Sequence, residues 1–89
     1  MQFSCDLNKS RANYLKHGIV LEFAQYLDWT KAVIWPDERQ NYNENRMRGL
    51  VPLDNRLYFL VYVMRNESIR CISLRKANKR EAKRYEKNQ

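Results

Sequence analysis

The clearest pattern of hydrophobic positions lies at 56–65, where the sequence RLYFLVYVMR predicts a single long strand. Alternation along a strand separates its side chains onto two faces. One face would carry Leu57, Phe59, Val61 and Val63, and the other Tyr58, Leu60, Tyr62 and Met64. Because both sets are largely apolar, the pattern predicts a central strand with both faces covered. The polar pair Asn66 and Glu67 favours a hairpin turn, after which residues 68–75 return as the neighbouring strand.

The N-terminal part of the chain predicts a short strand at 2–5, followed by a helix over about 7–17. Asp6 is a favourable residue at the start of that helix, because its carboxylate can accept backbone N–H groups. Gly18 suits the left-handed position that ends a helix. The apolar residues at helical spacing, which we expect to face the core, are Ala12, Leu15 and Ile19.

The middle of the chain alternates between short elements. They are a second helix over about 20–27, a strand over 31–35, a loop over 36–43, a strand over 44–51 and a turn at 54–55. The strand at 31–35 is β-branched and aromatic, and Pro36 ends it.

The C-terminal segment begins a final helix at Asn78, because Glu81 three residues later completes a capping box. The expected order is therefore β-α-α-β-β-β-β-α. Strands joined by short turns imply a small antiparallel β-sheet, flanked by two N-terminal helices and one C-terminal helix, in the α+β class. A chain of 89 residues is long enough for one domain, over 1–89, and too short for a second core.

Positive charge is concentrated near the C-terminus. Residues 65–89 hold nine Lys or Arg and three Glu, for +6 of the total of +7. Such a field attracts polyanions, so we expect RNA contacts from the cations that follow the last strand. The candidates are Lys76, Lys79, Arg80, Lys83 and Arg84, with Tyr85. A tyrosine there can stack on a base or pack against Ala82, and packing is the simpler interpretation.

Arginines at 65, 70 and 75 recur within the last two strands. A guanidinium presents a planar fork of donors that fits phosphate. Strict alternation would place Arg70 and Arg75 on opposite faces unless a bulge intervenes, and the face of Arg65 depends on the strand register. Glu44 and Arg46 stand two residues apart and could supply a base and a phosphate clamp. They could equally form an ion pair across strands that contributes little to stability.

His17 is the only histidine, in the last turn of the first predicted helix and beside Lys16. The negative end of the helix dipole would raise the pKa of His17 and suit it to proton transfer. The alternative is an ordinary helix end, where Lys and His are common. Lys9, Asn13 and Lys16 share one helix face, which we interpret as solvated unless it borders the basic surface of the sheet.

Several classes of function are disfavoured. No apolar run approaches the roughly 20 residues that cross a bilayer, and the charges at Asp6, Lys9 and Arg11 come too early for a signal peptide. Cys5 and Cys71 form a lone, distant pair, which favours reduced core thiols in a cytoplasm. We expect no metal and no other cofactor, because no cluster of Asp, Glu, His or Cys ligands is apparent.

A series of motifs runs through the chain in one order. They are FSCD over 3–6, Lys9, NYLKHGI over 13–19, Ala24, Glu44-Asn45-Arg46, the strand from Arg56 to Arg65, RCISLRKANKRE over 70–81, and Tyr85. In this combination the chain resembles the BrnT family of toxins. The family motifs run F-x-W-D, K, N-x-x-K-H-G-[VI], A, E-x-R and R-I-I-S-[AL]-R-K-A-[NT]-K-R-E…Y. The resemblance covers essentially the whole chain, and the last motif is the most distinctive.

Two positions depart from the family pattern. Cys5 stands where the family has Trp, and Val51 stands where the family has Gly, with a glycine instead at Gly49. If the family's Trp stacks on RNA, Cys5 alters activity or specificity. If that Trp is a core residue, Cys5 costs only some packing.

The resemblance implies a bacterial, cytoplasmic ribonuclease toxin of a type II toxin–antitoxin pair, with a RelE-like fold and no membrane association. It also implies a ribbon-helix-helix antitoxin that binds tightly and covers the active surface. A dimeric antitoxin would bring two toxin chains together, in a heterotetramer or a larger complex. The complex would bind operator DNA mainly through the antitoxin.

A RelE-like site would cleave RNA by activating the 2′-hydroxyl of the substrate, with cations stabilising the phosphorane. On that plan the catalytic candidates are His17 and Lys16 for proton transfer, Glu44 as an alternative base, and Arg46, Arg65, Arg70 and Arg75 for the phosphate. One rival is a basic module that binds an acidic protein or nucleic acid without chemistry. The other, a metal-dependent nuclease, is disfavoured by the ligand composition.

Overall fold

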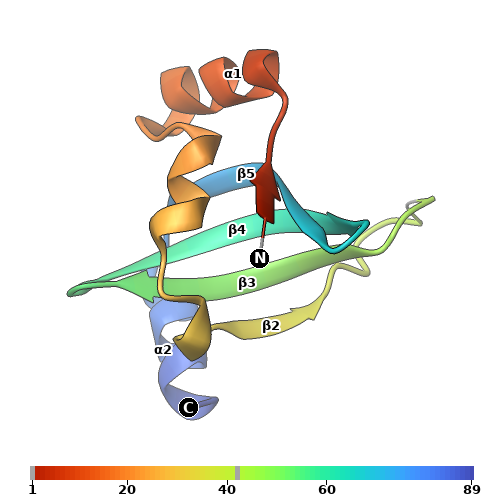
Figure 1. The fold of residues 1–89 in the computed structure, drawn as a ribbon. Helices are drawn as coiled ribbons and strands as arrows, with labels where there is room; N and C mark the ends of the chain where they lie inside the picture. The colour runs from red at the N-terminus through yellow and green to blue at the C-terminus, as the bar shows by residue number, and fades with distance from the viewer. Residues whose placement is uncertain (1, 42) are drawn as a thin grey trace.

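A computed structural model describes residues 2–41 and 43–89, and it places five strands in one sheet with helices on both sides (Figure 1). The strands are β1 (Gln2–Ser4), β2 (Val33–Pro36), β3 (Arg46–Leu53), β4 (Arg56–Arg65) and β5 (Ser68–Lys76). The α-helices are α1 (Leu7–His17) and α2 (Lys79–Lys87), and two 3₁₀ helices are η1 (Leu21–Tyr26) and η2 (Trp29–Lys31). The predicted α+β class is confirmed.

The sheet is mixed, with the strand order β1-β5-β4-β3-β2. Three strand pairs are antiparallel, but β1 runs parallel to β5, with Gln2 opposite Ser68 and Ser4 opposite Arg70. The prediction of an antiparallel sheet is therefore wrong at this edge. Most of the chain lies between β1 and β5, so this pair is not joined by a short turn and its direction is not set by one.

Two core clusters lie on opposite faces of the central strand β4, as its alternating pattern predicted. On one face Tyr58, Leu60 and Tyr62 are buried under η1, and we call this the η face. On the other face Phe59 and Val61 pack with Tyr85 of α2, and we call this the α2 face. In Figure 1 η1 lies in front of the sheet and α2 behind it.

Helix α1 has the predicted ends. Asp6 accepts the N–H groups of Asn8 and Lys9 at 2.8 and 3.1 Å, and Gly18 ends the helix with a left-handed φ of 75°. The expectation that Ala12 and Leu15 face the core is wrong, because Ala12 is exposed and the side chain of Leu15 is 81% exposed. Ile19, just beyond the helix, does pack partly buried against the core, as expected.

The buried side of α1 is polar. Asn13 donates to the carbonyl oxygens of Ile19 (2.7 Å) and Leu74 (2.8 Å), and it accepts the N–H of Leu74 at 3.2 Å. Ser10 accepts the N–H of Leu21 and donates to Glu22. Strand β1 pairs only with residues 68–70 of β5. Helix α1 binds the backbone N–H and carbonyl groups of Leu74, farther along the same edge, and so protects that edge of the sheet.

Several boundaries differ from the sequence expectations. The second helix is a 3₁₀ helix, over Leu21–Tyr26, and η2 was not predicted. The second and third strands each begin two residues later than expected. Residue 42, in the predicted loop over 36–43, and residue 1 of the expected domain lie outside the described residues. The turns at 54–55 and 66–67 are as predicted, and Asn66 and Glu67 both have left-handed φ angles, of 50° and 66°.

The capping box of α2 is present as predicted. Asn78 accepts the N–H of Glu81 at 2.8 Å, and the Glu81 carboxylate accepts the N–H of Asn78 at 2.9 Å. Tyr85 is buried and donates from its hydroxyl to the carbonyl oxygen of Lys31 at 2.8 Å. The Tyr85 bond thus links α2 to η2.

Asn13→Ala is expected to destabilise the protein by about 2–3 kcal/mol, because it leaves buried backbone groups of Leu74 without a partner. The free energy of unfolding from urea denaturation measures this loss. Asn8→Ala, on the exposed side of the same helix, is the control. Equal stability of the two variants would show that the Asn13 amide does not hold α1 to β5.

Candidate functional site

A β-bulge in β5 decides which side chains share a face. Val61 of β4 lies opposite Ser73 and Tyr62 lies opposite Cys71, so Ile72 is an extra residue in β5. After Ile72, the side chains of β5 therefore point to the opposite faces from those that strict alternation would give them. The bulge that the sequence argument named as the exception is therefore present.

Arg70 and Arg75 consequently lie on the same face. Arg70 is opposite Val63 and Arg75 is opposite Phe59. Paired residues of neighbouring strands point to the same side of a sheet, and Phe59 belongs to the α2 face. The opposite placement that strict alternation implies is wrong, because the bulge adds one residue between the two arginines.

The register brings more arginines to this face. Arg46 is opposite Val63 and Arg48 is opposite Val61, while Arg65 follows Val63 by two positions along β4. The α2 face therefore carries a set that we call the arginine face, which consists of Arg46, Arg48, Arg65, Arg70 and Arg75. The sequence argument missed Arg48. The spacing of two between Arg46 and Arg48 in one strand was the signal that could have identified it.

Glu44 links two members of the arginine face. Its carboxylate accepts from Arg65 at 3.0 Å and from Arg46 at 3.4 Å. The bond from Arg65 is the main cause that lowers the pKa of Glu44 below its usual value. A carboxylate stabilised in its ionised form is a weaker base. The structure contains the ion pair between Glu44 and Arg46 that the sequence suggested, and Glu44 also pairs with Arg65.

Arg48 is paired with a buried carboxylate. Asp37 is bound by Arg39 at 2.7 Å, and its nearer oxygen lies 3.7 Å from Nε of Arg48. The hydrogen bond from Arg39 is the first cause that lowers the pKa of Asp37 to about 2. Among the described residues, the buried Nε of Arg48 has no hydrogen-bond acceptor.

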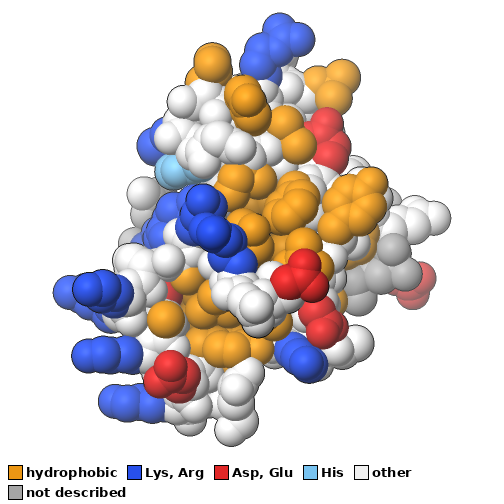
Figure 2. All heavy atoms as spheres, turned by 90° about the vertical axis from the view of Figure 1, so that its left-hand side faces the viewer, with side chains coloured by type: hydrophobic (Ala, Val, Ile, Leu, Met, Phe, Trp, Pro, Cys, Tyr) orange, Lys and Arg blue, Asp and Glu red, His pale blue; other side chains and the backbone are white. Residues whose placement is uncertain are grey.

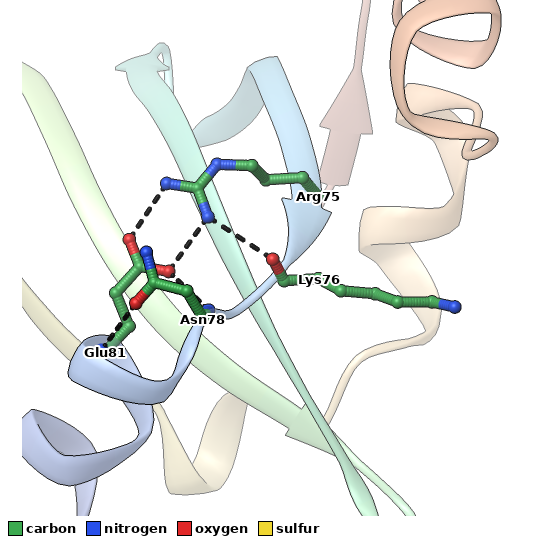
Figure 3. Close-up of polar contacts among 4 residues, drawn as sticks. All are labelled: Arg75, Lys76, Asn78 and Glu81. Atoms are coloured by element: carbon green, nitrogen blue, oxygen red, sulfur yellow. Dashed lines mark hydrogen bonds and ion pairs between the residues drawn. The ribbon is translucent and has the colours of Figure 1, made fainter.

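Arg75 joins β5 to α2 (Figure 3). Its guanidinium donates to both carboxylate oxygens of Glu81, at 2.8 and 2.9 Å, and to the carbonyl oxygen of Lys76 at 3.3 Å. It also lies 4.4 Å from the ring centre of Phe59. Burial by itself would raise the pKa of Glu81, but the bonds from Arg75 and Asn78 lower it overall. Any phosphate bound by Arg75 would share it with this carboxylate.

Arg70 differs from the other four arginines. Over residues 2–41 and 43–89 no carboxylate lies within 4.0 Å of its guanidinium. It is partly buried beside Val63, and its charge lowers the pKa of Asp6 only at longer range, after the helix-capping bonds. Arg70 is therefore the arginine on this face that can contact a phosphate without displacing a side chain.

His17 lies beside the bulge. A shallow groove of about 290 Å³ is lined by Lys9, Ala12, Asn13, Lys16 and His17 of α1, and by Ile72 and Ser73 of β5. The face that holds Lys9, Asn13 and Lys16 therefore borders the sheet, and Asn13 is buried in the contact. The solvated interpretation is wrong for Asn13, whose amide binds the backbone of β5, whereas Lys9 and Lys16 are exposed as that interpretation requires.

The expectation of a raised pKa for His17 is also wrong. Partial burial lowers the pKa of His17 below its ordinary value, and the positive charges of Lys16 and Arg75 lower it further. These effects act against the rise that a helix dipole would cause. A lowered pKa favours the neutral imidazole, which is the form that accepts a proton.

The site has two parts along the sheet. His17 and Arg75 belong to the first, at the level of Phe59, and the second lies at the level of Val63, where Arg46 and Arg70 flank the strand. Four residues of a strand separate these levels by about 13 Å. An extended polyanion of a few units can span both parts.

The cations expected to contact RNA lie at the end of β5 (Lys76) and on α2, and Lys76, Lys79, Arg80, Lys83 and Arg84 are all exposed. The guanidinium carbon of Arg84 lies 3.8 Å from the ring centre of Trp35, and Tyr85 is buried. Arg84 and Tyr85 thus make contacts within the protein, and packing is the role that the structure gives to Tyr85.

The cysteines are both free thiols. Cys5, at the position of the family's Trp, is partly buried against the core of the η face. Burial raises the pKa of both thiols, and that of Cys71 to about 12. Neither thiol is thus activated as a nucleophile.

No helix in residues 2–41 or 43–89 is long and apolar enough to cross a bilayer. Within the same ranges, no three side chains of His, Cys, Asp or Glu gather where they could hold a metal ion.

A protein-family model matches most of the chain. The family model described as "Ribonuclease toxin, BrnT, of type II toxin-antitoxin system" matches residues 6–81. The match extends from the residue that caps α1 to Glu81 in the first turn of α2, and it includes every member of the arginine face. A search of curated proteins finds no match.

Lys16→Gln is expected to raise the pKa of His17 toward its ordinary value, because it removes one of the two positive charges that lower it. Histidine NMR titration of the folded protein measures this pKa. Lys9→Gln, in the same groove, is the matched control. A pKa that stays the same or falls in Lys16→Gln would contradict this account of the electrostatics of His17.

Proposed function

The chain belongs to the BrnT family of ribonuclease toxins of type II toxin–antitoxin systems, and we propose that it cleaves RNA internally without a metal ion. Family membership makes RNA its substrate and an antitoxin its partner. The observation that carries the proposal is the bulge at Ile72. It places Arg70 and Arg75 on one face and lies beside the groove that holds His17.

In the proposed reaction, neutral His17 accepts the proton of a ribose 2′-hydroxyl. The 2′-oxygen attacks the adjacent phosphorus, the bond from phosphorus to the 5′-oxygen breaks, and a 2′,3′-cyclic phosphate remains. Lys16 is the proposed donor of the proton that the 5′-oxygen takes up. Arg75 would stabilise the negative charge of the phosphorane, and its effect on the pKa of His17 supports this proximity.

The second part of the arginine face would bind the flanking phosphates. We propose Arg70 as the first contact, with Arg46, Arg48 and Arg65 joining as their carboxylate partners are displaced. The exposed cations Lys79, Arg80 and Lys83 would extend the positive field along α2, and Lys76 would add to it from the end of β5. Arg84 and Tyr85 would support this surface through their contacts inside the protein.

Glu44 has two possible roles in this scheme, as an alternative base or as a counter-ion. Its bonds to Arg46 and Arg65 and its lowered pKa favour the counter-ion. In that role Glu44 occupies the position of a phosphate in the free protein and yields to it when RNA binds.

The partner is proposed to be a ribbon-helix-helix antitoxin. Its dimer would hold two toxin chains in a heterotetramer or a larger complex, which would bind operator DNA through the antitoxin. We place this system in the bacterial cytoplasm. These proposals follow from the family and not from the site geometry.

Glu44→Gln is expected to tighten RNA binding by about threefold to tenfold, because removing the counter-ion leaves two arginines for the phosphate. Fluorescence anisotropy measures the affinity, and single-turnover cleavage measures the rate. Asp54→Asn removes the same charge from a turn at the far end of β4, where Asn tolerates the left-handed φ of 54°. A loss in rate of about a hundredfold or more would instead identify Glu44 as the base.

Purified toxin, free of antitoxin, is expected to cleave RNA in EDTA and to leave 2′,3′-cyclic phosphate ends. His17→Ala should lower the rate by about a hundredfold or more, and Arg70→Ala should weaken RNA binding. Arg11→Ala, on the exposed side of α1, is the charge-matched control. Arg75→Ala is a less clean test, because it also removes the bonds to Glu81 that hold α2.

Cleavage that needs an added divalent ion, or full activity in His17→Ala, would refute the proposed mechanism. Binding without cleavage would point to a toxin that acts on the ribosome or to a module without chemistry. The same assay supplemented with ribosomes separates these two.

A further inference from the structure

Helix α1 presents its apolar residues to solvent. Its buried positions are Ser10 and Asn13, whereas Tyr14 and Leu15 are 55% and 81% exposed. Transfer of such side chains from water into a protein interface is favourable, so this exposed face of α1 is suited to contact with a partner.

The outward face of α1 continues into an apolar groove. The groove, of about 290 Å³, is lined by Tyr14, Gly18, Ile19, Val20, Phe23, Tyr58 and Lys76. The ring of Phe23 lies 5.4 Å from that of Tyr58 and 6.4 Å from that of Tyr26, which is 65% exposed. We call the rings of Tyr14, Phe23, Tyr26 and Tyr58, together with Val20, the aromatic groove. Figure 2 shows this side of the molecule, with hydrophobic side chains gathered in its middle and Lys and Arg side chains along one border.

The chemistry of the aromatic groove differs from that of the arginine face. Tyr58 belongs to the core of the η face, on the other side of the sheet from the arginines. Lys76 is the one cation that lines the groove among the described residues. The ring of Phe23 meets that of Tyr58 edge to face and that of Tyr26 at a tilt, and packed rings of this kind make an apolar surface suited to anchoring protein interfaces. A phosphate backbone would find few contacts here.

We propose that the aromatic groove is the docking surface for the antitoxin, and that it receives an amphipathic segment with apolar anchors and a carboxylate that faces Lys76. The family establishes that a type II toxin has an antitoxin. The net charge of +7 on the toxin favours an acidic partner. The inference rests on family membership and not on the cleavage mechanism proposed above.

Docking at this surface would also reach the site. Gly18, which lines the groove, directly follows His17 at the end of α1. A partner seated against Tyr14 and Gly18 would cover the end of the helix that carries Lys16 and His17. The antitoxin could thus restrict access to the proton-transfer group while its main contacts lie on a different face from the arginines.

Val20→Asp tests the proposal. Val20 is 43% exposed and precedes η1 at the capping position, where Asp is well tolerated. Isothermal titration calorimetry with the purified antitoxin of this toxin's own pair should show an affinity weakened by about thirtyfold or more. Tyr26→Ala should weaken it by about tenfold. The matched control is Ile34→Asp, because Ile34 is 42% exposed on the edge strand β2, outside the groove; its affinity should match the wild type.

Three results would overturn the proposal. Wild-type affinity in Val20→Asp, or an equal loss in Ile34→Asp, would place the antitoxin elsewhere. Weakened RNA binding by Val20→Asp with unchanged antitoxin affinity would make the groove a surface for bases. A toxin dimer that light scattering detects and that Val20→Asp dissociates would make the groove a self-association surface. Failure of the wild type to cleave RNA would count against the proposed mechanism alone, since the affinities are measured independently.

Discussion

The hydrogen bonds between the Asn13 side chain and the backbone of Leu74 hold together the two elements on which the candidate site depends. They fasten α1 to β5 just after the bulge at Ile72. The bulge resets the alternation of β5 and so brings Arg70 and Arg75 to one face. The bonded helix then ends with His17 beside the bulge. The residues proposed for proton transfer and for phosphate binding are therefore positioned by one backbone irregularity and one amide.

The charges of the site are balanced within the protein. Glu44, Asp37 and Glu81 pair with four of the five members of the arginine face. Concentrated like charges repel one another and destabilise a small fold, and these carboxylates reduce that cost. In the proposed mode of RNA binding a phosphate would replace these same bonds, so the stability of the free toxin and its affinity for RNA would compete. Arg70, with no carboxylate within 4.0 Å among the described residues, is outside this competition.

Features decided within a few residues of one another were predictable from the sequence. The two faces of β4, the start of α1 at Asp6, its end at Gly18 and the capping box of Asn78 and Glu81 all appear as expected. Each depends on side-chain alternation, on a backbone angle, or on a bond between near neighbours. The order of motifs also indicated the family, since that comparison needs no coordinates.

The sequence by itself thus determined the local elements, the concentration of positive charge and the family, while the tertiary structure decided how these parts face one another. The parallel pairing of β1, the outward side of α1, the inclusion of Arg48 in the arginine face and the lowered pKa of His17 were not predictable. Each depends on residues that are distant in the chain. Asn13 binds Leu74 of β5, sixty-one positions later, and the charge of Arg75 lowers the pKa of His17. The periodicity of a sequence predicts which side chains share a face of a helix or strand, and only the packed structure shows which other residues that face contacts.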